Sequence, residues 1–122
     1  MDTGRISFIR HGQKEILFLN FAECKPEEVF PIIEAAKMAI RTRPHGSVLT
    51  LTDVTNMRFD NQVSEEMKKF TAHNKPYVKA AAVVGVTGIK KIIFEAVMLF
   101  SKRKLHAFES HAQAKDWLAN NG

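Results

Sequence analysis

The sequence predicts a single α/β domain in which helices pack on one mixed, mostly parallel sheet of five strands. Two runs of alternating polarity open the chain, at Ile6–Arg10 and Lys14–Phe21, and strand-like and helix-like segments then alternate to its end. The segment Tyr77–Val86 is an almost uninterrupted run of small apolar residues, which is typical of a central strand covered on both faces. The expected element order, ββαβαβαβα, favours a layered fold with right-handed crossovers.

The two opening strands are expected to form a hairpin. A two-residue turn that ends in glycine, His11-Gly12, separates them, and such turns join antiparallel neighbours. Alternate residues of the second strand should therefore point to opposite faces of the sheet.

The first helix is expected to begin at Pro26, because proline is tolerated in the first turn of a helix, where Glu27 and Glu28 also complement the helix dipole. It should end near Arg41–Arg43. Pro31 is expected to kink the first turns or to delay the start of the helix. The apolar residues share one face: Val29, Ile32, Ile33, Ala36 and Ile40.

A buried strand is expected at Ser47–Asp53, followed by the polar stretch Val54–Asp60. Asp60 can cap the next helix, which should lie on the surface of the sheet and end before Pro76. The apolar stripe of that helix is narrow: Val63, Met67 and Phe70.

After the central strand, Thr87-Gly88 lead into an apolar helix at Ile89–Ser101. A short strand is expected at Lys104–Phe108, and Ser110 is placed to cap a last helix. The core face of that helix is expected to hold Ala114, Trp117 and Leu118.

Composition excludes several classes of protein. The 122 residues carry 18 Lys and Arg against 13 Asp and Glu, and the net charge of +5 permits an acidic partner but is ordinary in size. The single cysteine, Cys24, has no partner for an internal disulfide, and Met1–Arg10 lacks the pattern of a secretory signal, so we expect a cytoplasmic protein. The longest apolar run, Ala80–Val86, is far shorter than the ~20 residues of a membrane-spanning helix. No domain boundary is expected within residues 1–122.

Three stretches carry a resemblance to a known family: V-L-T-L-T-D-V-T, then K-A-A-A-V-V-G-V-T-G, and finally A-F-E-S-H-A-Q-A-K-D-W-L. With this element order, nearly the whole chain resembles the SpoIIAA-like family of the STAS (sulfate transporter and anti-sigma-factor antagonist) superfamily. The resemblance implies a small, non-enzymatic cytoplasmic domain that works by binding. It also implies an architecture similar to that of CRAL-TRIO lipid-transfer domains.

The better-understood members of the superfamily are switched by phosphorylation of a Ser or Thr at the start of the helix after the strand that matches Val48–Asp53. Asp53 matches the Asp that ends this strand, but the following segment is longer here and lacks the Ser-Gly turn. Thr55 and Ser64 are the nearest candidate phosphoacceptors, and neither lies in the matching motif. The alternative is that Thr55 and Asn56 are ordinary turn-forming residues.

A small-anion site is a second possibility that the sequence raises. Ligands of parallel sheets bind beyond the carboxyl ends of neighbouring strands, where helices start. The strands that end before residues 53–56 and 85–91 should be neighbours, and the second loop offers amides, a hydroxyl, two glycines and two cations. The alternative is that the glycines provide turn geometry and the lysines are solvated. The candidate ligands are Asp53, Thr55, Asn56, Thr87, Gly88, Lys90 and Lys91.

The helix expected at Ile89–Ser101 is too apolar for one buried face, since nine of the twelve residues from 89 to 100 are apolar. At about 100° per residue, the expected core face holds Ile89, Ile92, Ile93, Ala96 and Phe100. Phe94 and Met98 then fall beside Lys91 and Glu95, on a face that should meet water. We therefore predict an interface there, formed with a second copy of the chain or with another protein.

Two alternatives stay open for that face. The cations Lys90-Lys91 and Lys102-Arg103-Lys104 at the two ends of the helix could direct it to a lipid or an anionic membrane surface. The segment Arg58-Phe59 of the same chain could instead cover it. The sequence does not favour nucleic acid as a partner, because it has neither a stacking-aromatic motif nor a clustered basic face.

Enzyme chemistry is not predicted. The five histidines are scattered, none pairs with another at i+3 or i+4, and no metal site or cofactor is expected. Cys24 has no nearby base, and no serine lies in a nucleophile elbow. Asp53 is the one carboxylate at a strand end, and a single carboxylate does not define a reaction.

Overall fold

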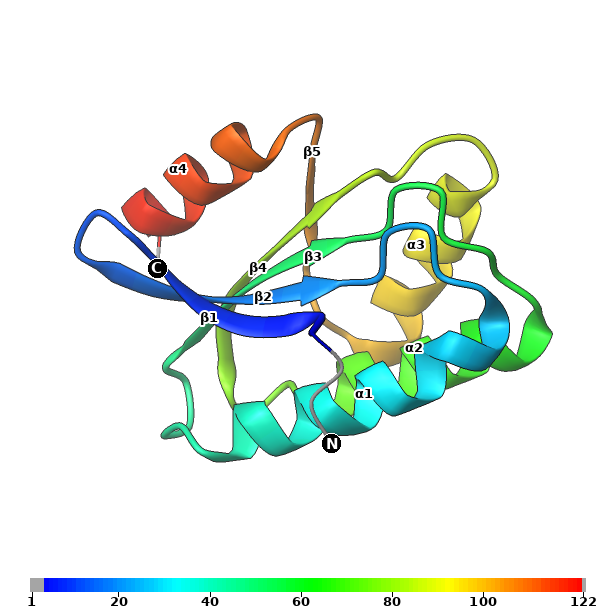
Figure 1. The fold of residues 1–122 in the computed structure, drawn as a ribbon, viewed down its shortest axis with the longest axis horizontal. Coiled ribbons are helices and arrows are strands. Elements are labelled where there is room, and N and C mark those ends of the chain that lie inside the picture. Colours follow the sequence, from blue (N-terminus) through cyan, green and yellow to red (C-terminus); the bar gives the residue numbers. More distant parts are fainter. Residues whose placement is uncertain (1–3, 122) are drawn as a thin grey trace.

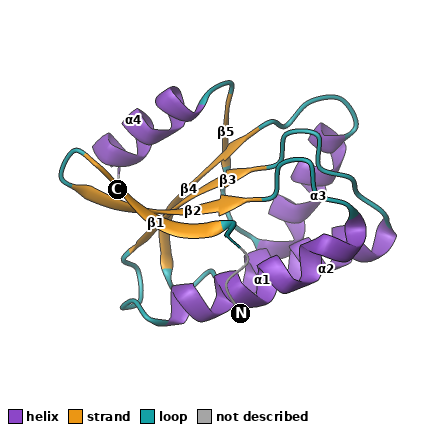
Figure 2. Cartoon of the chain, in the orientation of Figure 1, coloured by secondary structure: helices purple, strands orange, loops and turns teal. Residues whose placement is uncertain are grey.

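A five-stranded sheet separates two unequal layers of helices (Figure 1). In the computed structural model, which describes residues 4–121, helices α1, α2 and α3 cover one face of the sheet and α4 covers the other (Figure 2). The α/β class and the element order predicted from the sequence are confirmed. The elements are β1 (Ile6–His11), β2 (Lys14–Asn20), α1 (Pro26–Arg41), β3 (Val48–Asp53), α2 (Asn61–His73), β4 (Val78–Val84), α3 (Lys90–Ser101), β5 (His106–Phe108) and α4 (His111–Asn121).

The strands lie in the order β1-β2-β3-β4-β5, with one antiparallel pair at the start and parallel pairing from β2 onward. Each parallel strand lies beside the previous one, so the sheet grows in one direction. Connections of a single hand then place α1, α2 and α3 on the same face. Only α4, which follows the last strand, is free to fold over the opposite face.

Two apolar cores result from this arrangement. Leu17 and Leu19 of β2 belong to the core beneath α1, α2 and α3, whereas Ile16 of the same strand belongs to the core beneath α4. The alternation expected for this strand is therefore confirmed. Central strand β4 contributes to both cores, with Val83 on one side and Val84 on the other.

The ends of two elements differ from the prediction. The hairpin turn lies one residue later than predicted, because His11 still pairs with Lys14 and Gly12 takes the first turn position with φ of 62°. The last strand is also shorter than expected, since only three residues, His106–Phe108, pair with β4.

Helix α1 begins at Pro26 as predicted and continues through Pro31, which neither delays nor ends it. The amide of Lys25, just before the helix, donates to the carboxylate of Glu28 at 2.9 Å. The predicted caps of the later helices are confirmed: Asp60 accepts from the amide of Val63 at 2.7 Å, and Ser110 accepts from that of Gln113 at 3.2 Å.

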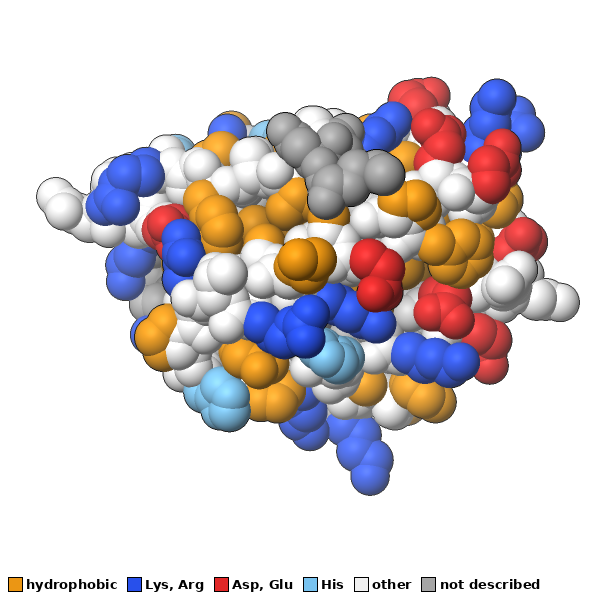
Figure 3. Space-filling view, turned by 60° about the horizontal axis from the view of Figure 1, so that its bottom comes forward, with side chains coloured by type: hydrophobic (Ala, Val, Ile, Leu, Met, Phe, Trp, Pro, Cys, Tyr) orange, Lys and Arg blue, Asp and Glu red, His pale blue; other side chains and the backbone are white. Residues whose placement is uncertain are grey.

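The surface is mixed in charge. On the side of the molecule drawn in Figure 3, basic and acidic side chains interleave with scattered apolar ones. Within residues 4–121, no helix has the length and apolarity needed to cross a membrane.

Candidate functional site

The carboxyl ends of β2, β3 and β4 form a joined set of loops. Backbone bonds of 2.9 Å link the amide of Phe21 to the carbonyl of Asp53 and the amide of Val54 to that of Val84. The prediction that the loops after β3 and β4 are neighbours is confirmed, because these strands pair in parallel.

Asp53 is the organising residue of this edge. Its side chain is 13% exposed, and its two oxygens are 2.8 Å from the amide nitrogen of Thr55 and from Nε2 of His111. Burial acts to raise the pKa of Asp53, but hydrogen bonds from the hydroxyl and amide of Thr55 and from His111 together hold it below its ordinary value. Asp53 is therefore an ionised, structurally engaged carboxylate.

His111 completes this pair and was not singled out from the sequence. It stands at the first position of α4, and its ring meets that of Phe18 edge-on at 5.4 Å between centroids. The pair spans 58 positions along the chain, so no sequence spacing could have indicated it. Among the contacts of the described residues, neither ring nor carboxylate meets a serine or cysteine that could act as a nucleophile.

Thr55 packs directly against Gly85. A Cβ added at Gly85 would lie 2.5 Å from both the nitrogen and the hydroxyl oxygen of Thr55, and Gly85 has φ of 93°. The glycine is therefore required twice, by its backbone conformation and by the close approach of the neighbouring loop. Asn56, with φ of 55°, donates through its side chain to Glu23 at 2.7 Å and ties this loop to the one after β2.

The loop after β4 touches the loop after β3 through one of its two lysines. Lys90 does reach across, with Nζ 2.9 Å from the carbonyl of Val54. The amides of Lys90 and Lys91, however, donate to the carbonyls of Thr87 and Gly88 in the first turn of the helix. Thr87, Gly88 and Lys91 are exposed, and the anion site stays a prediction.

The two candidate phosphoacceptors differ in their exposure to solvent. Thr55 is exposed, while Ser64 is half-buried in the first turn of α2. Their modification also stays a prediction.

Helix α3 is rotated relative to the orientation expected. Ile93 does pack against the core, as predicted, but the prediction that Ile89, Ile92 and Phe100 are buried was wrong. Phe94 packs against the core beneath the helices, and the sulfur of Met98 accepts from the amide of Leu105 at 3.5 Å. The exposed large apolar side chains are instead those of Ile89, just before the helix, and of Ile92, Leu99 and Phe100, with exposed fractions of 74%, 71%, 80% and 54%. We call these four residues the outer face of α3.

The reason for this rotation lies in Lys90. The buried face of α3 follows the spacing i, i+4, i+7, i+11 through Lys90, Phe94, Val97 and Ser101. The lysine belongs to this face because its ammonium group bonds the Val54 carbonyl while its stem lies along the cavity wall. Ser101 belongs there because its hydroxyl donates to the Val97 carbonyl at 2.7 Å. Because Lys90 and Ser101 are polar, the pattern of apolar residues did not indicate that this face is buried.

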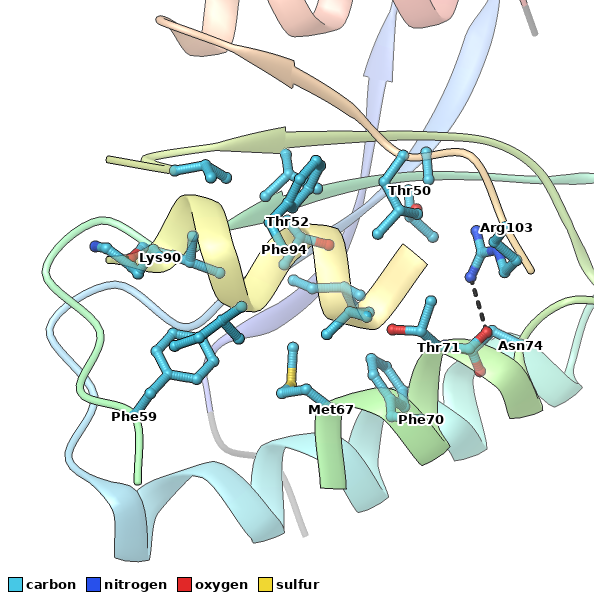
Figure 4. Close-up of a pocket in the computed structure, with 18 residues that line it drawn as sticks. Thr50, Thr52, Phe59, Met67, Phe70, Thr71, Asn74, Lys90, Phe94 and Arg103 are labelled. Atoms are coloured by element: carbon cyan, nitrogen blue, oxygen red, sulfur yellow. Dashed lines mark hydrogen bonds between the residues drawn. The ribbon is translucent and has the colours of Figure 1, made fainter. Parts of the chain in front are cut away.

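A cavity of about 70 Å³ lies between this buried face of α3, the sheet and α2 (Figure 4). Phe59 and Phe94 both line it, so the segment Arg58-Phe59 does lie near Phe94, as one alternative held. Lys90 stands at one end, and Thr71, Asn74 and Arg103 gather at the other (Figure 4). The sequence did not indicate this cavity.

Residues 4–121 contain no group of three or more His, Cys, Asp or Glu side chains placed to hold a metal ion. Cys24 is buried, and burial raises the pKa of its thiol, which disfavours the reactive thiolate. Comparisons of the chain with models of protein families, with curated proteins and with solved structures find no match. The resemblance to the SpoIIAA-like family therefore stays a prediction.

Replacing Asp53 with asparagine is expected to lower the free energy of unfolding at neutral pH by roughly 1–3 kcal/mol, since the charge is lost and one of the two buried acceptor oxygens becomes a donor. The lowered pKa also sets a pH dependence. The carboxylate stabilises the fold above its unfolded pKa of about 3.9, and that contribution is lost as pH falls through the lower folded value. Urea denaturation at several pH values should therefore show that the difference in free energy of unfolding between wild type and Asp53→Asn decreases below about pH 4.

Asp116→Asn is the matched control. Asp116 also accepts from a histidine, His11, at 2.7 Å, but its side chain is 71% exposed, so its loss should change stability by less than about 0.5 kcal/mol. Equal losses in the two variants, or a difference between wild type and Asp53→Asn that does not vary with pH, would contradict the role assigned to Asp53.

Proposed function

We propose that this chain is a non-catalytic, STAS-like interaction domain that associates with a second copy of itself through the outer face of α3. The observation that carries the proposal is the exposure of four large apolar side chains, three on α3 and that of Ile89 just before it. Folded monomers rarely leave contiguous apolar patches in water, because burying one such side chain is worth about 1.5–3 kcal/mol. The element order and the sequence resemblance support the assignment to the STAS superfamily.

The spacing of the outer face suits packing against another helix. Ile92 and Leu99 are seven residues apart and flank Ala96, a small residue four positions after Ile92. Large side chains on either side of a small one allow close approach of a second helix. A twofold symmetric pair would use this stripe from both copies, so each contact would occur twice.

The first test is the mass of the purified protein by light scattering over a range of concentrations. We expect a dimer, and Leu99→Glu and Ile92→Glu should each raise the dissociation constant roughly 100-fold or more, since each change removes two buried side chains per dimer. Met38→Glu is the matched control. Met38 is also a large exposed apolar residue, at 60%, but it lies on α1. A wild-type protein that stays monomeric, or a control that dissociates equally, would contradict the dimer.

A second candidate function is attachment to an anionic membrane surface. The observation that favours it is the position of exposed cations around the outer face, with Lys91 near its start and Lys102 and Lys104 beyond its end. Apolar side chains flanked by lysines suit an interface with acidic lipids. A monomeric wild-type protein that sediments with vesicles containing phosphatidylserine, and not with pure phosphatidylcholine vesicles, would favour this function over the dimer.

A further inference from the structure

The cavity between the sheet, α2 and α3 combines an apolar wall with an uncompensated cation. Most of its lining is apolar, including Val83 of β4 and Phe94 and Val97 of α3. Arg103 enters at one end, from the loop after α3 (Figure 4). A charged side chain against an apolar wall is costly unless a partner offsets its lost hydration.

Arg103 has little to offset that cost. Within residues 4–121 no carboxylate forms an ion pair with it, and its hydrogen bond goes from Nη1 to the carbonyl of Thr71 at 3.1 Å. Thr71 lies in the last turn of α2, so this bond also complements the negative end of that helix. A guanidinium has five N–H donors, and most of them remain for another acceptor.

Burial lowers the pKa of Arg103 to about 10. The side chain is therefore still a cation at neutral pH. The cause is burial alone, with no contribution from a neighbouring acid.

Asn74 supplies an independent observation at the same end of the cavity. It is 3% exposed, it lines the cavity, and its side-chain oxygen Oδ1 is buried without a hydrogen-bond partner. A buried acceptor left unpaired costs about 1–3 kcal/mol. This oxygen is therefore available to accept a hydrogen bond from a bound molecule.

We propose that this cavity binds a small apolar carboxylate that carries a neighbouring hydroxyl group, the chemistry of a 2-hydroxy acid. The carboxylate pairs with the free donors of Arg103, the hydroxyl donates to Asn74 Oδ1, and the hydrocarbon body lies along Val83, Phe94 and Val97. This site is independent of the outer face of α3, because it uses the opposite side of the helix.

The size of the cavity limits the ligand. At about 70 Å³ it is much smaller than the roughly 300–1,000 Å³ of sites for drug-sized molecules. A branched chain of about six carbons is therefore a suitable probe. At the other end of the cavity Lys90 is already engaged with the Val54 carbonyl, so Arg103 is the cation that should select the anion.

The test titrates the protein with three probes of similar shape, followed by the NMR signals of backbone amides and of the Arg103 and Asn74 side chains. The probes are 2-hydroxy-4-methylpentanoate, 4-methylpentanoate and the uncharged alcohol 4-methylpentan-1-ol. We expect affinity to fall in that order and the shifts to concentrate on residues that line the cavity. Equal binding of the alcohol and the hydroxy acid, or no binding of either carboxylate, would overturn the proposal.

Variants separate a specific site from weak surface binding. Arg103→Gln should weaken binding of the hydroxy acid about tenfold or more, since a charged hydrogen-bond donor is lost. Lys104→Gln removes a cation from the next residue, which is exposed and outside the cavity lining, and should leave the affinity unchanged.

If Arg103→Gln fails to fold, Ala81→Val provides a second test of the same cavity. Ala81 is buried and lines the cavity, so a larger side chain there fills the space and keeps the cation. We expect binding to weaken in this variant too. Unchanged affinity in Ala81→Val, or an equal loss in Lys104→Gln and Arg103→Gln, would contradict a site in this cavity.

Discussion

Gly85→Ala is expected to lower the free energy of unfolding by roughly 2–5 kcal/mol. Two costs combine at this position. The backbone of Gly85, with φ of 93°, is in a region that L-residues rarely adopt, and the added Cβ would lie 2.5 Å from the nitrogen and hydroxyl oxygen of Thr55. The second cost cannot be relieved by a side-chain rotation, because Thr55 N and Cα belong to the backbone. Urea denaturation followed by circular dichroism would measure the loss.

Gly88→Ala is the control for conformational strain alone. Gly88 also has a positive φ, of 58°, but a Cβ there would meet nothing within 4 Å. Its loss should be about 1–2 kcal/mol. Equal losses at the two glycines would show that the contact between Thr55 and Gly85 contributes nothing.

A substitution at Gly85 should also disturb Asp53 and His111, because Thr55, which contacts Gly85, is hydrogen-bonded to Asp53. Thr55 donates to Asp53, and Asp53 accepts from His111 at the start of α4. If Gly85→Ala folds, we expect the NMR signals of His111 to shift, although this ring lies on another element. Shifts confined to the loop after β4 would contradict this coupling.

Val97→Asp is expected to be the most damaging change on α3, with a loss of roughly 3 kcal/mol or more. Val97 is 6% exposed and belongs to the core beneath the three helices. A carboxylate there would be buried without a partner, which is among the few mechanisms that produce large single-residue effects. Thermal unfolding by circular dichroism would measure the effect.

Leu99→Asp is the matched control, two residues further along the same helix. Leu99 is 80% exposed, so the stability of the monomer should change by less than about 0.5 kcal/mol. The pair also tests the orientation of α3. If Leu99→Asp destabilised the monomer and Val97→Asp did not, the outer and buried faces would have been assigned the wrong way round.

Most of the fold could be predicted from the sequence because its signals are local. The turn glycine Gly12, the helix-starting Pro26 and the caps Asp60 and Ser110 act within a few residues of themselves. The placement of β4 inside the sheet also followed from composition, since a run of small apolar residues has no solvated face.

The candidate site was predictable only in part. The meeting of the loops after β3 and β4 follows from parallel pairing of consecutive strands, and the structure confirms it. The hydrogen bond between His111 and Asp53 could not be predicted in this way, because it joins the start of α4 to the end of β3. The sequence also did not predict that Arg103 and Asn74 line one cavity, since each is an ordinary polar residue next to a helix end.

By itself, the sequence determined the order of the elements, their approximate ends and the excess of apolar residues on α3. The tertiary structure alone decided which face of α3 is buried. Nine apolar residues in twelve leave two faces of similar hydrophobicity, and periodicity cannot rank them. The bond from Lys90 to the Val54 carbonyl and the packing of Val97 made that choice. The outer face of α3 and the cavity behind it both follow from how one helix is turned against the sheet.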